Sequence, residues 1–409
     1  MLIRPNYILS FLLLLLINSD LLAKDFSVLS YNAYLLPKME NDSLPERGDK
    51  IIDVVLKTDS DFVCLQEVWT NESRQQFTAK LKQKYPNFKY IKNGRKLKRL
   101  KTLSNFHENK SSCSMSDFYE IIRCKLFTDI SKCGVGKPVT ECLKKYCPTY
   151  LEHRQCWNCV IGVASDNHGV PTESQIINNC VLGNQISSFE MNPAVMIFSK
   201  YPIEKTEEAA FHFPNLPMRG GISALIDLGD GLKVKTGCSH FELIEDEFGF
   251  NFNHDKISSK DLNLDSFGFL YEMTKKLSDR KLPMFLVGDF NTEIEYWLSK
   301  PKDKVFRHPA NNLEVFLSKN PDFKSSPEKL DRGYGFCSFC PGEKGIFKKG
   351  PEIRFSHIDH ILFSNQDSEY EVKLKNFNFA TKTTDYLSDH LAVYGSYKIT
   401  HKPLIDKPK

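Results

Sequence analysis

Short runs rich in β-branched and aromatic residues recur along this chain, and they restrict its fold more than any other feature of the sequence. Several are apolar at nearly every position, which is typical of central strands covered on both faces. Between the runs, residues 51–56 and 267–277 carry apolar side chains at helical spacing. The pattern therefore predicts a layered α/β domain. The expected strands lie at 26–34, 61–69, 194–203, 221–228, 232–241, 284–290, 357–363 and 391–399.

Composition excludes several classes of protein. With 41% hydrophobic and 26% charged residues among 409, the chain is unlike a disordered, collagenous or many-pass membrane protein, and its length fits one large domain or two ordinary ones. The formal net charge of +4 is too small to indicate a polyanionic partner by itself. Residues 401–409 show no periodicity, so we expect a disordered tail there.

The N-terminal segment has the features of a secretory signal peptide. Arg4 precedes an apolar run at 8–17, and Ala23 offers a small residue at a cleavable position. The run is shorter than the roughly 20 residues that a membrane span needs. We therefore expect a signal peptide over 1–23, cleavage near Ala23, and a protein secreted to an extracellular or periplasmic space. An uncleaved N-terminal anchor is the alternative.

The cysteines are concentrated in one part of the chain. Eight of the twelve lie within residues 104–182, which in an exported protein predicts an insertion held by disulfides. Zinc is the alternative, because the C-x-x-C spacings at 156–159 and 337–340 are typical of zinc ligands. Cys64 and Cys238 lie inside apolar runs, and we expect them to be buried as small apolar side chains or bonded to each other.

A basic stretch lies ahead of this insertion. Residues 80–101 contain ten lysines and arginines and no acid. Such a stretch could face anionic lipid headgroups or the phosphates of a nucleic acid. A solvated helix face would explain it equally well.

Polar residues suited to metal binding or acid–base chemistry stand at the ends of the apolar runs. Strand ends on one edge of a sheet converge in space, so these residues can form one site. Oxygen ligands without thiolates suit a hard divalent cation such as Mg²⁺. Singly, each residue could be a turn former, a surface acid or a hydrogen-bonded core histidine. The ordered set favours a single site made of Asn32, Glu67, His240, Asp289, Asn291, Asp389 and His390.

The segments that carry these residues resemble the endonuclease/exonuclease/phosphatase superfamily, which includes deoxyribonucleases and neutral sphingomyelinases. They occur in the family's order and span nearly all of residues 26–399. Within the superfamily the sequence is most similar to the secreted neutral sphingomyelinases. This resemblance implies a two-layer β-sandwich flanked by helices, with one catalytic domain over 24–400 that contains the insertion. The matching segments are SYNAYLLP, LQEVW, SKYPI, CSHFE, VGDFNTE, HIDHILF and LSDHLAV.

The resemblance also implies how a metal is held. Glu67 would anchor Mg²⁺, and Asn32 would hold either the metal shell or a phosphate oxygen. Asp389 would bind the metal or support the neighbouring histidine. Another divalent cation could replace Mg²⁺.

The remaining residues are assigned acid–base and positioning roles by the resemblance. His390 would act as general base towards the attacking water, with Asp359 accepting its other N–H. Asp289 would orient the water, and Asn291 would donate a hydrogen bond to the phosphoryl oxygen. His240, on the opposite side, would stabilise or protonate the leaving oxygen.

These observations predict a secreted, monomeric, Mg²⁺-dependent phosphodiesterase that cleaves sphingomyelin to ceramide and phosphocholine, with membrane sphingolipid as its substrate partner. A secreted deoxyribonuclease that uses the same site on a nucleic acid is the alternative. A non-catalytic module that binds a partner through the cysteine-rich insertion is a third reading. The complete set of metal and histidine residues argues against that third reading.

Overall fold

The computed structural model describes a large part of the chain. Several predicted features lie outside the described residues, namely the signal peptide, most of the insertion, Asp389 and the C-x-x-C spacing at 337–340. The described residues are 23–35, 44–92, 98–99, 113–116, 118–119, 156, 159, 163, 172–182, 193–211, 219–241, 259–292, 312–326, 357–364, 368–379, 387–388 and 390–402.

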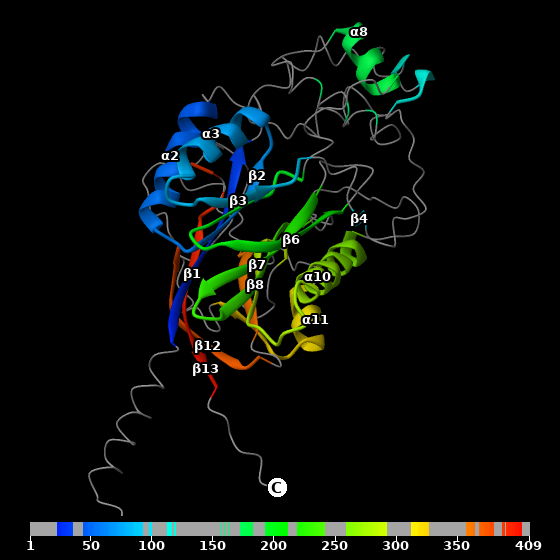
Figure 1. Ribbon diagram of the computed structural model, residues 1–409. Coiled ribbons are helices and arrows are strands. Elements are labelled where there is room, and N and C mark those ends of the chain that lie inside the picture. The colour runs from blue at the N-terminus through cyan, green and yellow to red at the C-terminus, as the bar shows by residue number, and fades with distance from the viewer. Residues whose placement is uncertain are drawn as a thin grey trace, which may run out of the picture.

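Two mixed β-sheets form the centre of the described chain (Figure 1). The first sheet has the strand order β12 (Tyr370–Phe379), β13 (Val393–His401), β1 (Lys24–Leu35), β2 (Phe62–Val68), β5 (Met196–Ser199) and β3 (Asn87–Tyr90). The second has the order β10 (Phe323–Ser326), β11 (Asp359–Ser364), β9 (Met284–Asp289), β8 (Leu232–His240), β7 (Arg219–Gly229), β6 (Ile203–Phe211) and β4 (Lys98–Arg99).

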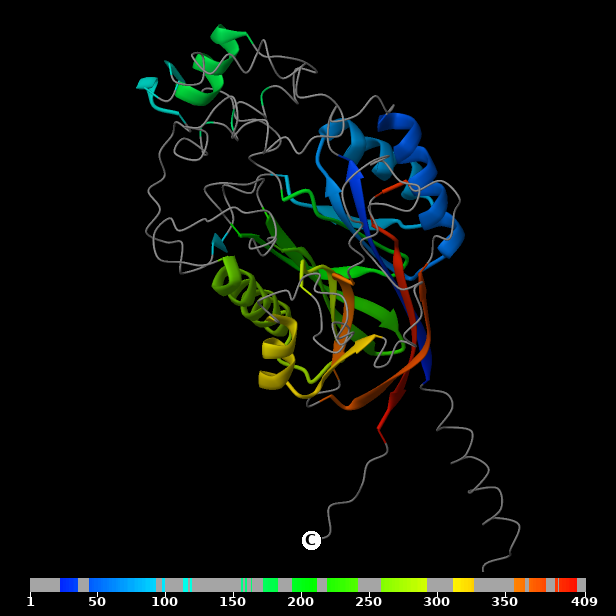
Figure 2. The same cartoon turned by 180° about the vertical axis from the view of Figure 1, so that it is seen from behind.

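Helices cover the outer faces of both sheets. The first sheet carries α2 (Leu44–Thr58) and α3 (Asn71–Leu81), whereas the second carries α10 (Ser259–Lys275) and α11 (Asn312–Lys319). The two helix pairs lie on opposite sides of the molecule, as Figure 2 shows from behind. The predicted two-layer sandwich flanked by helices is therefore confirmed. In the described part of the chain, no helix is long and apolar enough to cross a membrane.

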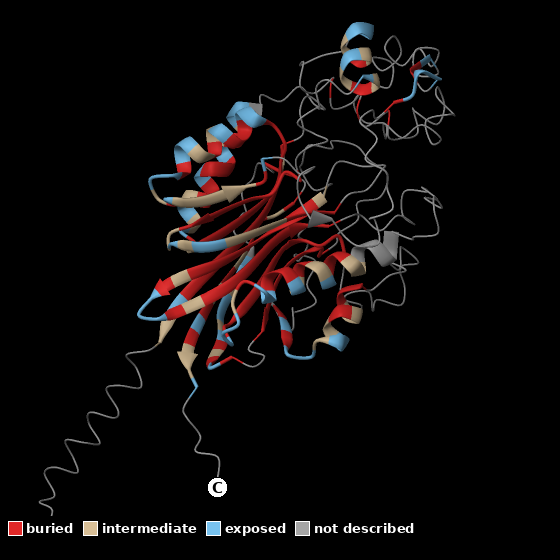
Figure 3. Ribbon diagram, turned by 45° about the vertical axis from the view of Figure 1, so that its right-hand side comes forward, coloured by how far each residue is buried: buried red, intermediate tan, exposed pale blue. Residues whose placement is uncertain are grey.

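Alternation along the central strands explains why they are apolar at nearly every position. In β2, Phe62 and Cys64 point into the core between the sheets, whereas Val63 and Leu65 pack under the helices of the first sheet. All of these side chains are fully buried. Figure 3 shows the same pattern throughout, with buried strands between helices whose outer faces are exposed. Burying one such side chain contributes about 1.5–3 kcal/mol.

The helical spacings predicted at 51–56 and 267–277 correspond to α2 and α10. Ile51 and Val55 of α2 pack on the first sheet, and Phe267 and Leu270 of α10 pack on the second. The C-terminal end of α10 is tied to β8 by Lys235, whose ammonium group donates to two backbone carbonyls there, at 2.9 and 2.5 Å.

The eight predicted strands are all present, and the described part of the chain contains five others that the sequence pattern missed. The missed strands are β3, β4, β6, β10 and β12. Four of them lie at the edges of the sheets, and the fifth, β6, carries polar residues at five of its nine positions. The partly exposed faces of β3, β6, β10 and β12 give these strands no continuous apolar run. The tail prediction is wrong at its start, because β13 extends to His401 and Lys402 N donates to Glu369 O at 2.8 Å.

The described part of the insertion lies between β4 and β5. It contains α8 (Glu173–Ile176) and the π-helical turn η5 (Ile177–Val181). Two disulfides, Cys113–Cys156 and Cys159–Cys180, hold it together. These bonds support the disulfide prediction over zinc for the spacing at 156–159. The strand before the insertion, β4, pairs with β6 in the second sheet, whereas the strand after it, β5, lies between β2 and β3 in the first sheet.

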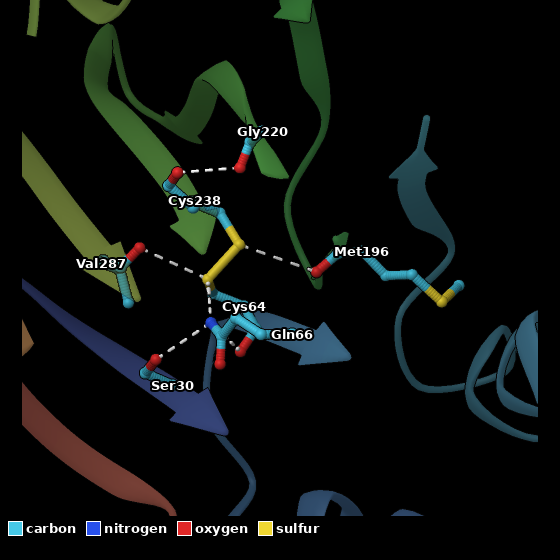
Figure 4. The surroundings of a disulfide bond; sticks show 8 residues. Ser30, Cys64, Gln66, Met196, Gly220, Cys238 and Val287 are labelled. Carbon is cyan, nitrogen blue, oxygen red and sulfur yellow. Dashed lines mark hydrogen bonds between the residues drawn. A yellow bond between two sulfur atoms is a disulfide. The ribbon is translucent and has the colours of Figure 1, made fainter. Parts of the chain in front are cut away.

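A third disulfide crosses the core between the sheets. It joins Cys64 of β2 to Cys238 of β8, with an S–S distance of 2.07 Å, and both residues are fully buried. Figure 4 shows the bond between strands of the two sheets, with the carbonyls of Met196 and Val287 beside the sulfurs. Of the two alternatives for these cysteines, the structure therefore contains the mutual bond.

Candidate active site

The predicted polar residues converge because of how the strands run. β1 and β2 are parallel, so Asn32 and Glu67 both lie near the carboxyl ends of their strands. β8 and β9 are also parallel, with His240 paired to Asp289. β11 is antiparallel to β9 and begins where β9 ends, which places Asp359 opposite Asp289. Residues from both sheets therefore meet at one end of the sandwich.

The amide of Asn32 lies at the centre of this group. Its Nδ2 donates to Oδ2 of Asp289 at 2.9 Å and to Oε1 of Glu67 at 3.2 Å. Its Oδ1 accepts from the backbone N–H of Tyr34 at 3.0 Å. The amide is thus held with its NH₂ group towards the two carboxylates and its oxygen towards the backbone. Asn32 is fully buried.

Glu67 adopts an uncommon backbone conformation at the end of β2. Its φ is +58°, in the left-handed region that costs a residue with a side chain on the order of 1 kcal/mol or more. Such strain persists where the surroundings fix the residue, and here Trp69 Nε1 donates to Oε2 at 3.3 Å. The Glu67 side chain is 11% exposed, whereas that of Asp289 is 1% exposed and that of Asp359 is fully buried. Among these carboxylates, Glu67 is therefore the most accessible to a cation from solvent.

His390 and Asp359 form a closely paired unit. Nδ1 of His390 lies 2.7 Å from Oδ2 of Asp359, and its Nε2 lies 3.7 Å from Oδ2 of Asp289. The hydroxyl of Ser388 accepts from the backbone N–H of His390 at 3.1 Å and donates to the carbonyl of Asn32 at 2.7 Å. The imidazole is therefore oriented from both its ring and its backbone.

His240 faces the same carboxylates from β8. Its Nε2 lies 3.3 Å from Oδ2 of Asp289 and 3.8 Å from Oε1 of Glu67. Its Nδ1 lies 2.7 Å from Nη1 of Arg219. Burial lowers the pKa of His240, the Arg219 charge lowers it further, and the Asp289 carboxylate opposes both effects.

Asp289 follows a residue, Gly288, whose backbone conformation and surroundings require glycine. The preceding residue, Gly288, has φ of +151°, and a Cβ there would lie 1.9 Å from the carbonyl oxygen of Ser239. Oδ1 of Asp289 accepts from the backbone N–H of Asn291 at 3.0 Å, while Asn291 Nδ2 donates to the Phe241 carbonyl at 2.8 Å.

The protonation of Asp289 follows from its neighbours. Burial by itself raises the pKa of this carboxyl group. The imidazoles of His240 and His390 and the amide of Asn32 outweigh burial, so the pKa lies below its usual range. Asp289 is therefore an anion at neutral pH.

Comparison with models of known families shows which family the chain belongs to. A family model described as the endonuclease/exonuclease/phosphatase family matches residues 29–390. The chain belongs to this family. Its members hydrolyse phosphodiester bonds. No curated protein matches the sequence significantly.

Solved structures share the fold of this endonuclease/exonuclease/phosphatase protein. A magnesium-bound double mutant of beta toxin from Staphylococcus aureus is 14% identical, with 93% of this chain and 100% of that chain covered and a TM-score of 0.50. TDP2 from D. rerio, complexed with a single-strand DNA product, is 12% identical, with 91% and 99% covered and a TM-score of 0.50. Sphingomyelinase C from Streptomyces griseocarneus is 14% identical, with 91% and 99% covered and a TM-score of 0.49. At these identities the likeness to beta toxin and to TDP2 establishes the fold alone.

The side chains of this family member fit a divalent cation. The carboxylates of Glu67 and Asp289 both accept a hydrogen bond from the same amide nitrogen, Nδ2 of Asn32. A cation suits such a concentration of negative charge, and oxygen donors suit a hard one. Within the described residues, one group offers three ligand atoms within 4.8 Å of one another, and it consists of Asp289, Asp359 and His390. The predicted ligand Asp389 lies outside the described residues.

Seven of the eight predicted site residues thus lie at this end of the sandwich, and their roles stay predictions. Sequence reasoning missed Arg219, which contacts His240 and lies 3.9 Å from Glu67. The pattern began this strand at residue 221, whereas β7 begins at Arg219. The signal available in the sequence was a basic residue, Arg219, at the start of β7, the strand that pairs with the strand of His240.

Proposed function

We propose that this protein is a secreted, Mg²⁺-dependent phosphodiesterase that hydrolyses sphingomyelin to ceramide and phosphocholine. One observation carries the catalytic part of the proposal. Two carboxylates, Glu67 and Asp289, share the Asn32 amide, with a histidine on either side of Asp289. A phosphodiester resists water because its charge repels the nucleophile and its alkoxide leaves poorly, so a catalyst must neutralise, orient and transfer protons.

His390 serves as the general base in this proposal. The Asp359 carboxylate can only accept a hydrogen bond from Nδ1 of His390. Nδ1 therefore carries the proton of the neutral ring, and Nε2 keeps its lone pair. Nε2 can then take a proton from the attacking water. Asp289, an anion next to this nitrogen, orients the water and stabilises the imidazolium that forms.

Glu67 would hold the cation, assisted by Asp289. When bound, a divalent cation polarises the phosphoryl oxygen and offsets its negative charge. The hardness of the carboxylate set favours Mg²⁺. Asp389 remains a proposed further ligand.

We favour sphingomyelin over DNA as the proposed substrate for two reasons. The motifs resemble those of the secreted neutral sphingomyelinases more closely than those of the nucleases. The basic stretch at 80–101 also has much of its described charge neutralised, which weakens it as a surface for nucleic-acid phosphates. Its ion pairs are Lys80–Asp49 at 2.6 Å, Lys84–Asp59 at 2.9 Å and Lys89–Glu208 at 2.9 Å.

Secretion is part of the proposal, with cleavage near Ala23. The first strand begins at Lys24, so cleavage there would leave the sheet intact. The disulfides support an oxidising destination. Mass spectrometry of the exported protein tests this point, because a mature N-terminus far from Lys24 would contradict it.

A parallel assay tests the activity. The mature, disulfide-intact protein is incubated with sphingomyelin liposomes and with plasmid DNA, each with Mg²⁺ and with a chelator. We expect Mg²⁺-dependent release of phosphocholine and intact DNA, and we expect His390→Ala to abolish the release. DNA cleavage without phosphocholine release would establish the deoxyribonuclease alternative. Hydrolysis that persists in the chelator would refute the metal dependence.

A further inference from the structure

The two histidines of the site have opposite partners on the same ring nitrogen. Nδ1 of His390 lies 2.7 Å from the Asp359 carboxylate, which can only accept a hydrogen bond. Nδ1 of His240 lies 2.7 Å from Arg219 Nη1, which can only donate one. Neutral His390 therefore carries its proton on Nδ1, and neutral His240 carries it on Nε2.

The strands hold Arg219 beside His240. Arg219 is the first residue of β7, and the next residue, Gly220, pairs directly with His240 of β8. On its other side, β7 lies close to β6. A Cβ on Gly220 would be 2.4 Å from the carbonyl oxygen of Ala209 on β6, so glycine permits the close approach of β7 to β6. The guanidinium also lies over the Trp69 ring, at 5.9 Å from its centre.

Among the described site residues, Arg219 lies closer to His240 than to Glu67. Oε1 of Glu67 is 3.9 Å from Nη1 of Arg219, beyond hydrogen-bonding distance. The His240 nitrogen is 1.2 Å closer. A simple ion pair with Glu67 would not require the guanidinium to approach an imidazole lone pair.

We propose that Arg219 is a positioning residue that fixes His240 as the Nε2–H tautomer, so that His240 donates a hydrogen bond to an oxygen of the reacting phosphodiester and takes no part as a base. The inference rests on the proposed phosphodiesterase function and deepens it. It gives a structural reason for the different roles of the two histidines: His390 presents a lone pair, and His240 presents an N–H. Of the two roles expected for His240, stabilising or protonating the leaving oxygen, this assigns the first.

The tautomer is measured directly by ¹⁵N NMR of histidine-labelled, metal-free mature protein at a pH where both imidazoles are neutral. The His240 and His390 signals are assigned with His240→Gln and His390→Gln. We expect His240 to have an unprotonated Nδ1 and a protonated Nε2, and His390 the reverse. A protonated Nδ1 on His240 would overturn the proposal.

Substitutions separate positioning from general structure. Arg219→Met removes the donor, and we expect His240 to become a mixture of tautomers and kcat to fall up to about 100-fold with little change in KM. Arg219→Lys restores a donor and should restore the Nε2–H form and most of kcat. The matched control is Arg74→Met, which removes a buried arginine bonded to the Trp69 carbonyl and should leave the tautomer unchanged.

Failure of the inference and failure of the proposed function are distinguishable. The tautomer is read without substrate or metal, so it is tested even if neither sphingomyelin nor DNA is hydrolysed. An unchanged His240 tautomer in Arg219→Met would overturn the inference while leaving the phosphodiesterase proposal intact. If Arg219→Met does not fold, the wild-type spectrum and Arg219→Lys still decide the question.

Discussion

The disulfide between Cys64 and Cys238 should account for a large share of the stability of this fold. It joins the two sheets across the core and links residues 174 apart in sequence. The chain-entropy relation gives about 5 kcal/mol for a loop of this length, at the upper end of the range found for disulfides. The disulfides Cys113–Cys156 and Cys159–Cys180 lie within that loop and shorten it, but the dependence is logarithmic and lowers the value by less than about 1 kcal/mol.

We therefore expect the double variant Cys64→Ala/Cys238→Ala to lose about 3–5 kcal/mol of unfolding free energy, measured by urea denaturation followed by circular dichroism. Both cysteines are fully buried, so a reductant should not cleave the bond until denaturant opens the core. The matched control is Cys113→Ala/Cys156→Ala, which should leave the sheet packing of the sandwich unchanged. A loss below about 1 kcal/mol in the core variant would refute the reasoning.

Three further predictions concern the site and its surroundings. His390→Ala should lower kcat about 10²–10⁴-fold in the liposome assay, because it removes the general base; near-normal turnover with an intact fold would contradict its role. Glu67→Gln should weaken divalent-cation binding in calorimetry, whereas unchanged affinity would exclude Glu67 as a ligand. Burial lowers the pKa of His360 from 6.5 to about 4. Between pH 4 and pH 6.5 the unfolded chain therefore binds more protons than the folded chain. The free energy of unfolding should therefore rise by up to about 3 kcal/mol from pH 4 to 6.5. His360→Gln should make this rise with pH smaller. An equal rise in the variant would contradict the role given to His360.

The central strands were predictable because both of their faces are buried. In β2 and β9 every residue is buried, so the sequence shows an apolar run up to the polar residues near the end of each strand. In β12 and β6 exposed and buried positions intermix, and Lys and Glu side chains interrupt the run. Edge strands derive their place from a neighbour's backbone rather than from their own side chains, which single-sequence patterns do not reveal.

The site was predictable as a set of residues but not as an arrangement of atoms. Strand ends converge in any such sandwich, which is why Asn32, Glu67 and Asp289 could be grouped. The direction of each polar atom depends on tertiary contacts. The Asn32 oxygen, for example, faces the backbone of Tyr34. The partner that distinguishes His240 from His390 is Arg219, from a strand whose start the pattern placed two residues too late.

The central claim is that far-apart strand ends surround one divalent cation. Anomalous diffraction from crystals of the mature protein soaked in Mn²⁺, a Mg²⁺ substitute with a usable anomalous signal, tests it most directly. The account predicts a peak at coordination distance from the Glu67 carboxylate, on the side that faces Asp289. A site without a peak at saturating Mn²⁺, or a peak elsewhere with Glu67 and Asp289 unligated, would contradict it.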